Sequence, residues 1–345
     1  MFIHFNGEQD EYNREPDGVA VTHVDDIMSA GDTEFESEVM NGMKKSFEFG
    51  SEEEQEFRYV GMNIVQYDQG IEMNNNHYID ALELPNMEVA KHLTVDQVME
   101  SAGQTEFRSV VGKLTSLAHS SRPDICFDVK VLSSKFGRAT KRDLQTARKR
   151  MIKIKGEDTN MRFPDLGKDM ENWILIGHGD AGVKSMPDKI TSVGGYVVLL
   201  CNKKTAKCCV LGWKSKQIRR KVISSLAGET LAMIGVIGEL VYTKAVLEQL
   251  YGKRVQDIPT IAVTDSKNLA EAIKSTSLVD DPWLIPDIAV IKEAIEQKTI
   301  SEVRRVPGEE MLADSLTKAG ASGAMFLEDG RGNRSAANVS IFNFV

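Results

Sequence analysis

The stretch Ile174-Leu-Ile-Gly-His-Gly-Asp180-Ala-Gly182 joins a short apolar run to a single carboxylate. Residues 173–177 have the length and composition of a buried β-strand, and the glycines around Asp180 indicate that the strand ends before this residue. An aspartate at that position is either a residue of a Gly-Asp turn or one ligand of a site at the edge of a sheet. The stretch alone leaves both interpretations open.

The segments that follow this strand predict an α/β layer with a mixed sheet. Strands are expected over 173–177, 194–200 and 208–213, in a meander, and then over 260–264 and 302–306, which alternate with helices. Three strands in a meander followed by alternating helices and strands are typical of a mixed five-stranded sheet with flanking helices.

Three more acids lie where these predicted elements begin or end. Glu229 comes early in the long helix, Asp265 closes a strand, and Asp314 lies in Met311-Leu-Ala-Asp-Ser-Leu316. Asp265 is alternatively an N-cap for the helix that begins near Ser266, and Asp314 is alternatively on a solvated helix face.

Glu229 is harder to explain as a surface residue. It shares a helix face with Met233, Ile237 and Leu240, so it is expected to point inward, where a carboxylate is costly unless it is paired or bound to a metal. Acids that converge at one sheet edge suit two-metal phosphoryl chemistry. We therefore expect two Mg²⁺ or Mn²⁺ ions to be held by four catalytic ligands: Asp180, Glu229, Asp265 and Asp314.

A basic run precedes the long helix. Its members are Lys214, Lys216, Arg219, Arg220 and Lys221. Such a run is often only a solvated surface. Beside a cluster of acids it also suits contact with the phosphate backbone of a nucleic acid, and this is the role that we expect.

Near the start of the chain, Thr22-His-Val-Asp25-Asp26-Ile27 places two carboxylates side by side. The simplest interpretation is a polar hairpin turn between two β-branched strands. The alternative is a platform for a divalent metal, which prefers carboxylate oxygens together with substrate phosphates.

Between these two acidic regions the pattern is largely helical. A helix is expected over 32–47, two strands over 57–73 around the turn Asp68-Gln-Gly70, and helices almost throughout 94–155. Breaks are expected at Gly103, at Ser120-Ser-Arg-Pro123 and at Gly137. Residues 163–169 are the best linker candidate, and the stretch beyond Ala321 is expected to be a disordered tail.

Composition limits the class of protein. The 345 residues are 41% hydrophobic and 27% charged, as in an ordinary globular protein, and the net charge of -9 argues against a general nucleic-acid-coating protein. No signal peptide is evident, and the apolar segment Leu231–Leu247 is interrupted by charges and expected to be too short for a bilayer. Because the four cysteines lack metal-site spacing, we expect free thiols and an intracellular location, cytoplasmic or nuclear, without a membrane.

Six ordered motifs carry a resemblance to a known family. They are THVDDIMSAG, FRYVGMNI, FRSVVGKLTSLAHSSRPDICFDVKVLSSKF, GWKSKQIRRKVISSLAGETLA, VTDSKNLAEAI and VPGEEMLADSLTKAGAS. Over approximately residues 1–322 the chain resembles the C-terminal part of the Pol polyprotein of copia-type LTR retrotransposons. That part comprises the end of the reverse transcriptase and the following ribonuclease H.

The resemblance implies a domain order. Residues 1–88 would be the C-terminal remnant of the reverse transcriptase palm, 89–156 the thumb and connection helices, and 157–169 a linker. A ribonuclease H-like domain would then span 170–322, before a tail over 323–345. The fold class expected is therefore α+β / α/β: partial palm hairpins and helices, then a mixed five-stranded sheet.

The resemblance also implies roles for the acids. Asp25 and Asp26 would be two metal ligands of a polymerase site, and the later quartet would be the metal ligands of ribonuclease H, which cleaves the RNA strand of an RNA-DNA hybrid. The expected partners are this hybrid and other Pol-derived chains. The first palm aspartate and the fingers of the family would lie upstream of Met1, so polymerase activity is not expected.

Departures from the family keep a second hypothesis open. His23 replaces the usual aromatic, Pro282 and Pro286 interrupt a segment that is basic and helical in relatives, and Gly228 adjoins Glu229 at a helix-propensity cost of about 1 kcal/mol. These changes are typical of decay. The chain is therefore either a ribonuclease H with an incomplete polymerase part or an inert or domesticated relic that at most binds nucleic acid.

Overall fold

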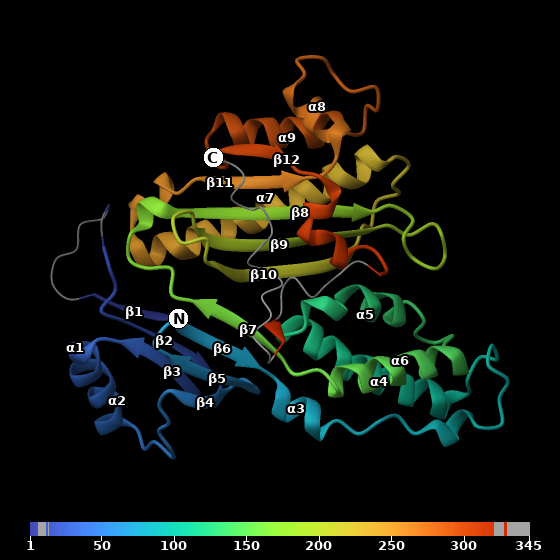
Figure 1. Ribbon diagram of the computed structural model, residues 1–345, viewed down its shortest axis with the longest axis horizontal. Helices are drawn as coiled ribbons and strands as arrows, with labels where there is room; N and C mark the ends of the chain where they lie inside the picture. The colour runs from blue at the N-terminus through green and yellow to red at the C-terminus, as the bar shows by residue number, and fades with distance from the viewer. Residues whose placement is uncertain (6–11, 13, 321–327, 330–345) are drawn as a thin grey trace.

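The computed structural model describes residues 1–5, 12, 14–320 and 328–329. In Figure 1 the main sheet, five-stranded and formed by residues 173–305, fills the upper half of the molecule, and a helical module (87–155) lies at the lower right. A three-stranded sheet and a second five-stranded sheet of shorter strands lie at the lower left and lower centre. The fold is thus mixed α+β, as the sequence predicts.

The main five-stranded sheet has the order β10-β9-β8-β11-β12, and the second has the order β13-β7-β6-β5-β4. The first three strands of the main sheet form an antiparallel meander, and β11 runs parallel to both β8 and β12, which confirms the predicted mixed sheet. The strands are β8 (Trp173–Gly182), β9 (Val193–Asn202), β10 (Cys208–Gln217), β11 (Thr260–Thr264) and β12 (Glu302–Arg305).

Strand β8 continues five residues beyond the predicted end at Gly177. Asp180 pairs with Gly195 and Gly182 with Val193, so the glycines extend the strand instead of ending it. The prediction that Asp180 follows the strand is therefore wrong. The residue lies inside β8, and the turn interpretation does not apply to it.

Alternation along the strands assigns the two faces of this sheet. Leu175 and Val198 pack with residues of α7 (Ser225–Tyr251), α8 (Lys267–Lys274) and α9 (Ile285–Glu296). Ile176, Val197 and Leu199 pack on the opposite face with the 3-10 helix η7 (Leu312–Leu316) and with the helical module. The sheet is therefore buried on both faces.

Helix α7 is 27 residues long and apolar enough to cross a bilayer by length and composition. The expectation that this segment is too short to span a membrane is therefore wrong. However, Met233, Val236 and Leu240 are buried against the sheet, and the core helix of a globular domain has the same composition.

The helical module contains η2 (Met87–Ala90), α4 (Ser101–Ser120), η3 (Pro123–Ile125), α5 (Cys126–Ser133) and α6 (Lys141–Lys155). Pro123 occupies the first turn of η3, and Gly137 has a φ of +78° between α5 and α6, so both breaks are confirmed. Gly103 lies inside α4, packed on Met99, and the break expected there is wrong. Residues 94–100 precede α4 and are not helical.

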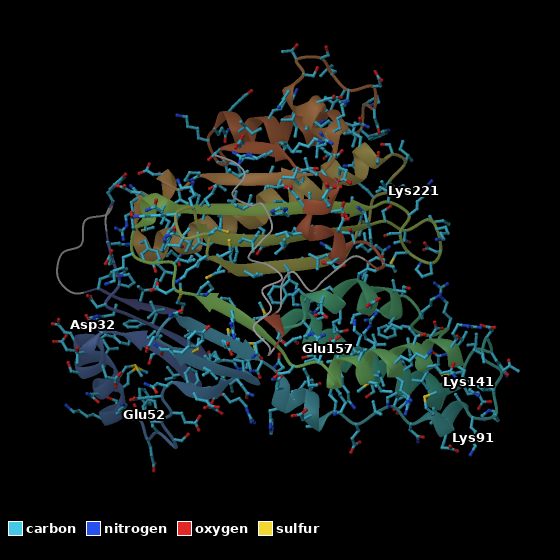
Figure 2. The ribbon with its side chains drawn as sticks, in the orientation of Figure 1. Asp32, Glu52, Lys91, Lys141, Glu157 and Lys221 are labelled. Atoms are coloured by element: carbon cyan, nitrogen blue, oxygen red, sulfur yellow. The ribbon has the colours of Figure 1, made fainter. Side chains whose placement is uncertain are left out.

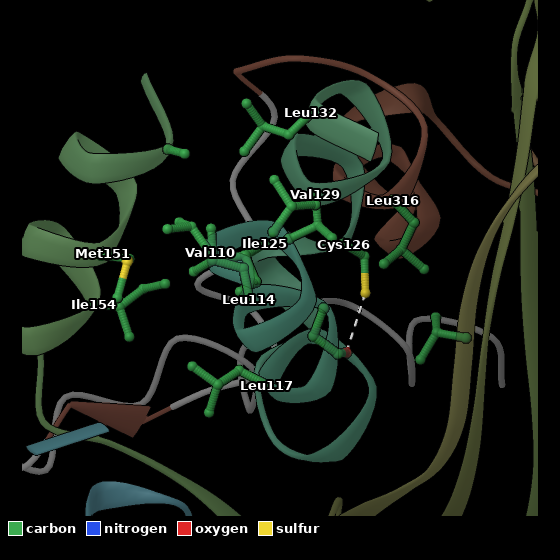
Figure 3. Packing of buried hydrophobic residues seen from close by; sticks show 14 of the residues in the cluster. Val110, Leu114, Leu117, Ile125, Cys126, Val129, Leu132, Met151, Ile154 and Leu316 are labelled. Carbon is green, nitrogen blue, oxygen red and sulfur yellow. Dashed lines mark hydrogen bonds between the residues drawn. The ribbon is translucent and has the colours of Figure 1, made fainter. Parts of the chain in front are cut away.

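The helical module shares one hydrophobic core with the five-stranded sheet. Figure 3 shows Leu316 of η7 beside Cys126 and Val129 of α5, within the cluster that α4 and α6 complete. The indole Nε1 of Trp213 in β10 donates to the Ala118 carbonyl oxygen of α4 at 2.8 Å. The module therefore fixes the position of η7 and covers the sheet face that carries Ile176, Val197 and Leu199.

The N-terminal part forms a three-stranded sheet and a helix. The strands are β1 (Phe2–His4), β2 (Gly18–His23) and β3 (Asp26–Gly31). The predicted helix over 32–47 is present as α1 (Thr33–Phe35), a π-helical segment η1 (Glu36–Met40) and α2 (Asn41–Ser46). Asp32 caps its first turn through Phe35 N–H, and Phe35 is buried against the hairpin.

Residues 56–74 form three strands, whereas two were predicted. They are β4 (Glu56–Tyr59), β5 (Met62–Tyr67) and β6 (Gly70–Asn74), followed by α3 (Asn76–Ala81). The missed turn is Val60-Gly61, where both residues have positive φ, at 49° and 75°. Valine is rare in that conformation, so Gly61 is the one residue of this pair that favours a turn.

The segment 157–169, expected to be a linker, contains β7 (Thr159–Pro164), which pairs with β6. The 3-10 helix η4 (Met170–Asn172) follows it. The other edge of β7 pairs with β13 (Glu328–Asp329). Apart from these two residues, the expected tail over 323–345 lies outside the described residues. The domain boundaries themselves stay a prediction.

Candidate metal centre

Three carboxylates from distant parts of the chain meet at one end of the five-stranded sheet. Asp180 comes from β8, Glu229 from the second turn of α7, and Asp265 directly follows β11. One ligand oxygen of each lies within 4.8 Å of the other two, and this is the only such group of three potential metal ligands in the described part of the chain. The structure thus brings together three of the four predicted residues.

Asp180 is the most deeply buried of the three acids. It is fully buried, and its Oδ1 accepts from the Lys318 ammonium at 3.1 Å, while the Thr317 hydroxyl donates to Oδ2. Both oxygens of this carboxylate therefore have protein donors.

Glu229 has the least compensated charge. The backbone N–H of Ala181 donates to its carboxylate, but Oε2 is buried without a hydrogen-bond partner. Burial, together with the neighbouring Asp180 and Asp265, raises the pKa of Glu229 from 4.5 to about 9. A cation at this oxygen would remove the penalty.

Gly228 explains how α7 comes this close to β8. A Cβ at this position would lie 2.8 Å from Val183 Cγ2 and 3.1 Å from the Ala181 Cβ. The glycine therefore permits the close approach that places Glu229 beside Asp180. Because close packing explains this glycine, we no longer interpret Gly228 as a sign of decay.

Asp265 and Asp314 are half-buried. Burial, and then the charge of Asp180, raises the pKa of Asp265. The pKa of Asp314 is also raised by burial, opposed by Lys318, whose Nζ donates to Asp314 Oδ1 at 2.8 Å. Ser266 is the N-cap of α8, so the N-cap alternative for Asp265 is wrong.

Asp314 reaches the site through Lys318 and is not a member of the group of three. It lies on η7, and the ammonium of Lys318 bridges it to Asp180. Sequence reasoning missed Lys318 and Thr317 as site residues. The four-residue spacing between Asp314 and Lys318 is the signal that could have found the lysine.

A glycine in β9 lets η7 lie over the sheet at this point. Gly195 is the register partner of Asp180, and a Cβ there would lie 2.7 Å from Thr317 Cγ2 and 2.8 Å from Leu316 Cβ. Any side chain at this position would push Thr317 and Lys318 away from Asp180.

The donor set fits a divalent metal ion. Carboxylate oxygens are the ligands that Mg²⁺ and Mn²⁺ prefer, and an unpartnered buried oxygen among three acids is the position that a cation would stabilise. The residues that would hold such an ion are Asp180, Glu229 and Asp265, with Asp314 on the side of the Lys318 ammonium.

The basic residues lie near this end of the sheet. Lys214 and Lys216 are on β10, while Arg219, Arg220 and Lys221 lie in the segment that leads to α7; Lys221 is labelled in Figure 2. All five are exposed. The register places Lys214 and Lys216 on the sheet face opposite Gly195, because their partners are Tyr196 and Gly194.

Arg220 is held by the α9 region. Its Nη1 lies 2.6 Å from Asp287 Oδ2, and its Nη2 donates to the Trp283 carbonyl at 3.1 Å. Pro286 occupies the first turn of α9, where proline is tolerated. Pro286, one of the two prolines that suggested decay, is thus compatible with an ordered helix, and Pro282 lies in the turn that precedes it.

Asp25 and Asp26 lie on an exposed hairpin. Val24 and Asp25 form its two-residue turn, Val24 has a φ of 55°, and His23 pairs with Asp26. Within the ranges that the structure describes, these aspartates belong to no group of three potential metal ligands. The geometry agrees with the hairpin-turn interpretation.

Comparisons with known proteins give structural neighbours among ribonucleases H. No family model matches the chain, and no curated protein matches it. LC11-RNase H1, isolated from compost by a metagenomic approach, is 18% identical over 42% of this chain and 92% of its own, with a TM-score of 0.32. The same enzyme in complex with an RNA/DNA hybrid gives 18% identity, coverages of 41% and 93%, and a TM-score of 0.31.

The N-terminal RNase H domain of Rv2228c from Mycobacterium tuberculosis, in a fusion with maltose binding protein, is also similar. It is 18% identical, with coverages of 41% of this chain and 89% of its own, and a TM-score of 0.30. Similarities at this level do not establish family membership.

Proposed function

We propose that the chain is a metal-dependent nuclease of the ribonuclease H type that hydrolyses the RNA strand of RNA-DNA hybrids. The observation that carries this proposal is the convergence of Asp180, Glu229 and Asp265 within 4.8 Å, with Glu229 Oε2 buried and unpartnered. Without a cation, three acids at this spacing destabilise the fold, because like charges cannot all ionise there.

Each residue of the site has a proposed role. Asp180, Glu229 and Asp265 hold the divalent ions, which when bound would supply Lewis-acid stabilisation and an activated water. The ammonium of Lys318 partly neutralises the carboxylates of Asp180 and Asp314. Lys214, Lys216, Arg219 and Lys221 contact backbone phosphates, and Arg220 anchors their segment to α9.

The ordered series of six motifs supports the hybrid as the substrate and a retrotransposon as the source. We infer that the chain is a fragment of a copia-type Pol polyprotein in which residues 1–88 are a palm remnant. Asp25 and Asp26 lie on an exposed hairpin, and no third acid is grouped with them among the described residues. We therefore propose that this chain alone does not catalyse nucleotide transfer. Another Pol-derived chain is a proposed partner.

The test is cleavage of a hybrid labelled on its RNA strand, with Mg²⁺, with Mn²⁺ and with chelator. We expect metal-dependent cutting that Asp180→Asn reduces by at least about 10²-fold, since even residues that only support metal ligands are worth about 10–100-fold. Asp80→Asn, at an exposed position on α3, is the matched control and should cut normally. Equal cutting by Asp180→Asn would refute the site.

One observation favours a second candidate function, a relic that binds nucleic acid without catalysis. Lys318 already supplies a cation to Asp180 and Asp314, so this lysine competes with a metal ion for the same oxygens. In that case the folded protein would bind the hybrid, and Mg²⁺ or Mn²⁺ would neither raise its Tm nor cause cutting.

A further inference from the structure

Two cysteine side chains face each other across the β9–β10 hairpin. Cys201 and Cys208 are direct register partners, and both are free thiols. Asn202 N–H donates to the Lys207 carbonyl at 2.9 Å, so the pair next to the turn is hydrogen-bonded and Cys201 and Cys208 occupy the next, non-hydrogen-bonded position. At such positions the Cα atoms lie about 4.5 Å apart, within the range that a disulfide spans.

The two thiols also share one environment. Cys201 is fully buried in the core cluster that the sheet shares with the helical module, and Cys208 packs against the same cluster while half-exposed. A hydrogen bond to Cys208 and burial raise the pKa of Cys201. The adjacent Cys209 belongs to the cluster on the other face of the sheet, where its Sγ donates to the Pro164 carbonyl at 3.4 Å.

We propose that Cys201 and Cys208 form a redox modification site, which a peroxide converts into a disulfide within the folded protein. The half-exposed Cys208 reacts first. Its sulfur attacks one peroxide oxygen, the O–O bond breaks, and the departing hydroxide leaves as water with the thiol proton, which yields a sulfenic acid.

The second step closes the bond. The Cys201 sulfur attacks the Cys208 sulfur, the S–O bond breaks, and the hydroxyl leaves as water with the Cys201 proton. Overall the two thiols lose two electrons and two protons, and one peroxide becomes two waters. Two molecules of a small thiol such as glutathione reduce the protein disulfide by two successive exchanges and are themselves joined as a disulfide.

This site is separate from the acidic cluster. Along β9, Cys201 lies six residues from Gly195, the partner of Asp180, which is about 20 Å at 3.3–3.4 Å per residue. Failure of the proposed nuclease function would therefore leave the proposal for the thiol pair intact.

The experiment treats the reduced, folded full-length protein with hydrogen peroxide, then unfolds it, alkylates the remaining thiols and maps the peptides by mass spectrometry. We expect two of the four cysteines to resist alkylation as a Cys201–Cys208 disulfide that dithiothreitol reverses. Cys209→Ser is the matched control and should retain this bond, whereas Cys208→Ser should lose it.

Circular dichroism of each protein before treatment verifies the fold. A folded protein in which Cys201 and Cys208 both remain alkylatable would overturn the proposal. A bond from Cys208 to Cys209, to Cys126 or to a second molecule would overturn it as well.

Discussion

Glu229 is a buried carboxylate with one unpartnered oxygen, and its titration has a defined sign. Its pKa is about 9 in the folded protein and 4.5 as the ordinary value, so the folded state holds the proton more tightly. A raised carboxyl pKa stabilises the fold fully below pH 4.5, and this stability is lost as the pH rises to about 9.

We therefore predict that, in chelator, the Tm falls between pH 5 and 9 and that Glu229→Gln flattens this fall, because the amide does not ionise. Thermal unfolding at a series of pH values measures the Tm of both proteins. The expectation fails if the wild-type and Glu229→Gln proteins have parallel pH profiles.

The second prediction for a single residue concerns Lys318. Lys318→Met removes the ammonium that bridges Asp180 and Asp314, and leaves a buried carboxylate without its cation. The lysine is partly exposed, so we expect a loss of about 1–2 kcal/mol in chelator, less than for a fully buried pair. Because the competitor is gone, a larger rise of Tm with Mg²⁺ is expected.

Lys318→Arg keeps the positive charge and serves as the control for this substitution. Urea unfolding with chelator and with Mg²⁺ gives both quantities. If Lys318→Met were as stable as the wild-type protein in chelator, the ammonium would not compensate the acids.

At the scale of elements, the contact between β9 and η7 depends on Gly195, and the neighbouring Gly194 faces the other side of the sheet. A Cβ at Gly195 would overlap Leu316 and Thr317, whereas a Cβ at Gly194 finds its nearest atom at 3.5 Å. Gly195→Ala is predicted to cost about 1–3 kcal/mol and to weaken the effect of metal on Tm, because η7 must move.

Gly194→Ala, the adjacent control, should change stability by less than about 0.5 kcal/mol. Chemical unfolding and the Tm shift with Mg²⁺ compare the two variants. Similar values for both would show that η7 is not held by close contact at Gly195.

The elements also show what periodicity can and cannot reveal. Apolar runs predicted all five strands of the main sheet, since buried strands are short and β-branched. The predicted end of β8 is wrong because the glycines around Asp180 pair with β9 and form no turn there. Glu229 and Asp265 could be recognised from their positions near element ends, whereas Asp180 was placed after a strand that in fact contains it. Thr317 and Lys318 enter only through η7, whose place depends on packing with α5.

At the scale of the whole molecule, the helical module and the five-stranded sheet share one core. Removal of residues 1–169 would expose the sheet face that carries Ile176, Val197 and Leu199. We predict that a fragment spanning 170–320 has a lower Tm than the full chain and binds a hydrophobic dye, because that face loses its cover.

A fragment spanning 89–320, which keeps the module, is the comparison for this prediction. It should bind less dye and unfold at a higher temperature. Equal behaviour of the two fragments would mean that the sheet and its own helices are sufficient by themselves.

Strand β7 has a further consequence for this architecture. It follows the helical module in the chain, yet its hydrogen-bonded partner β6 precedes that module. A protease that cut the connection at Gly137 would therefore leave two pieces that remain interleaved, with the later piece still donating a strand to the earlier one. Two fragments produced separately, one ending and the other beginning at Gly137, should therefore bind each other and restore the native fold.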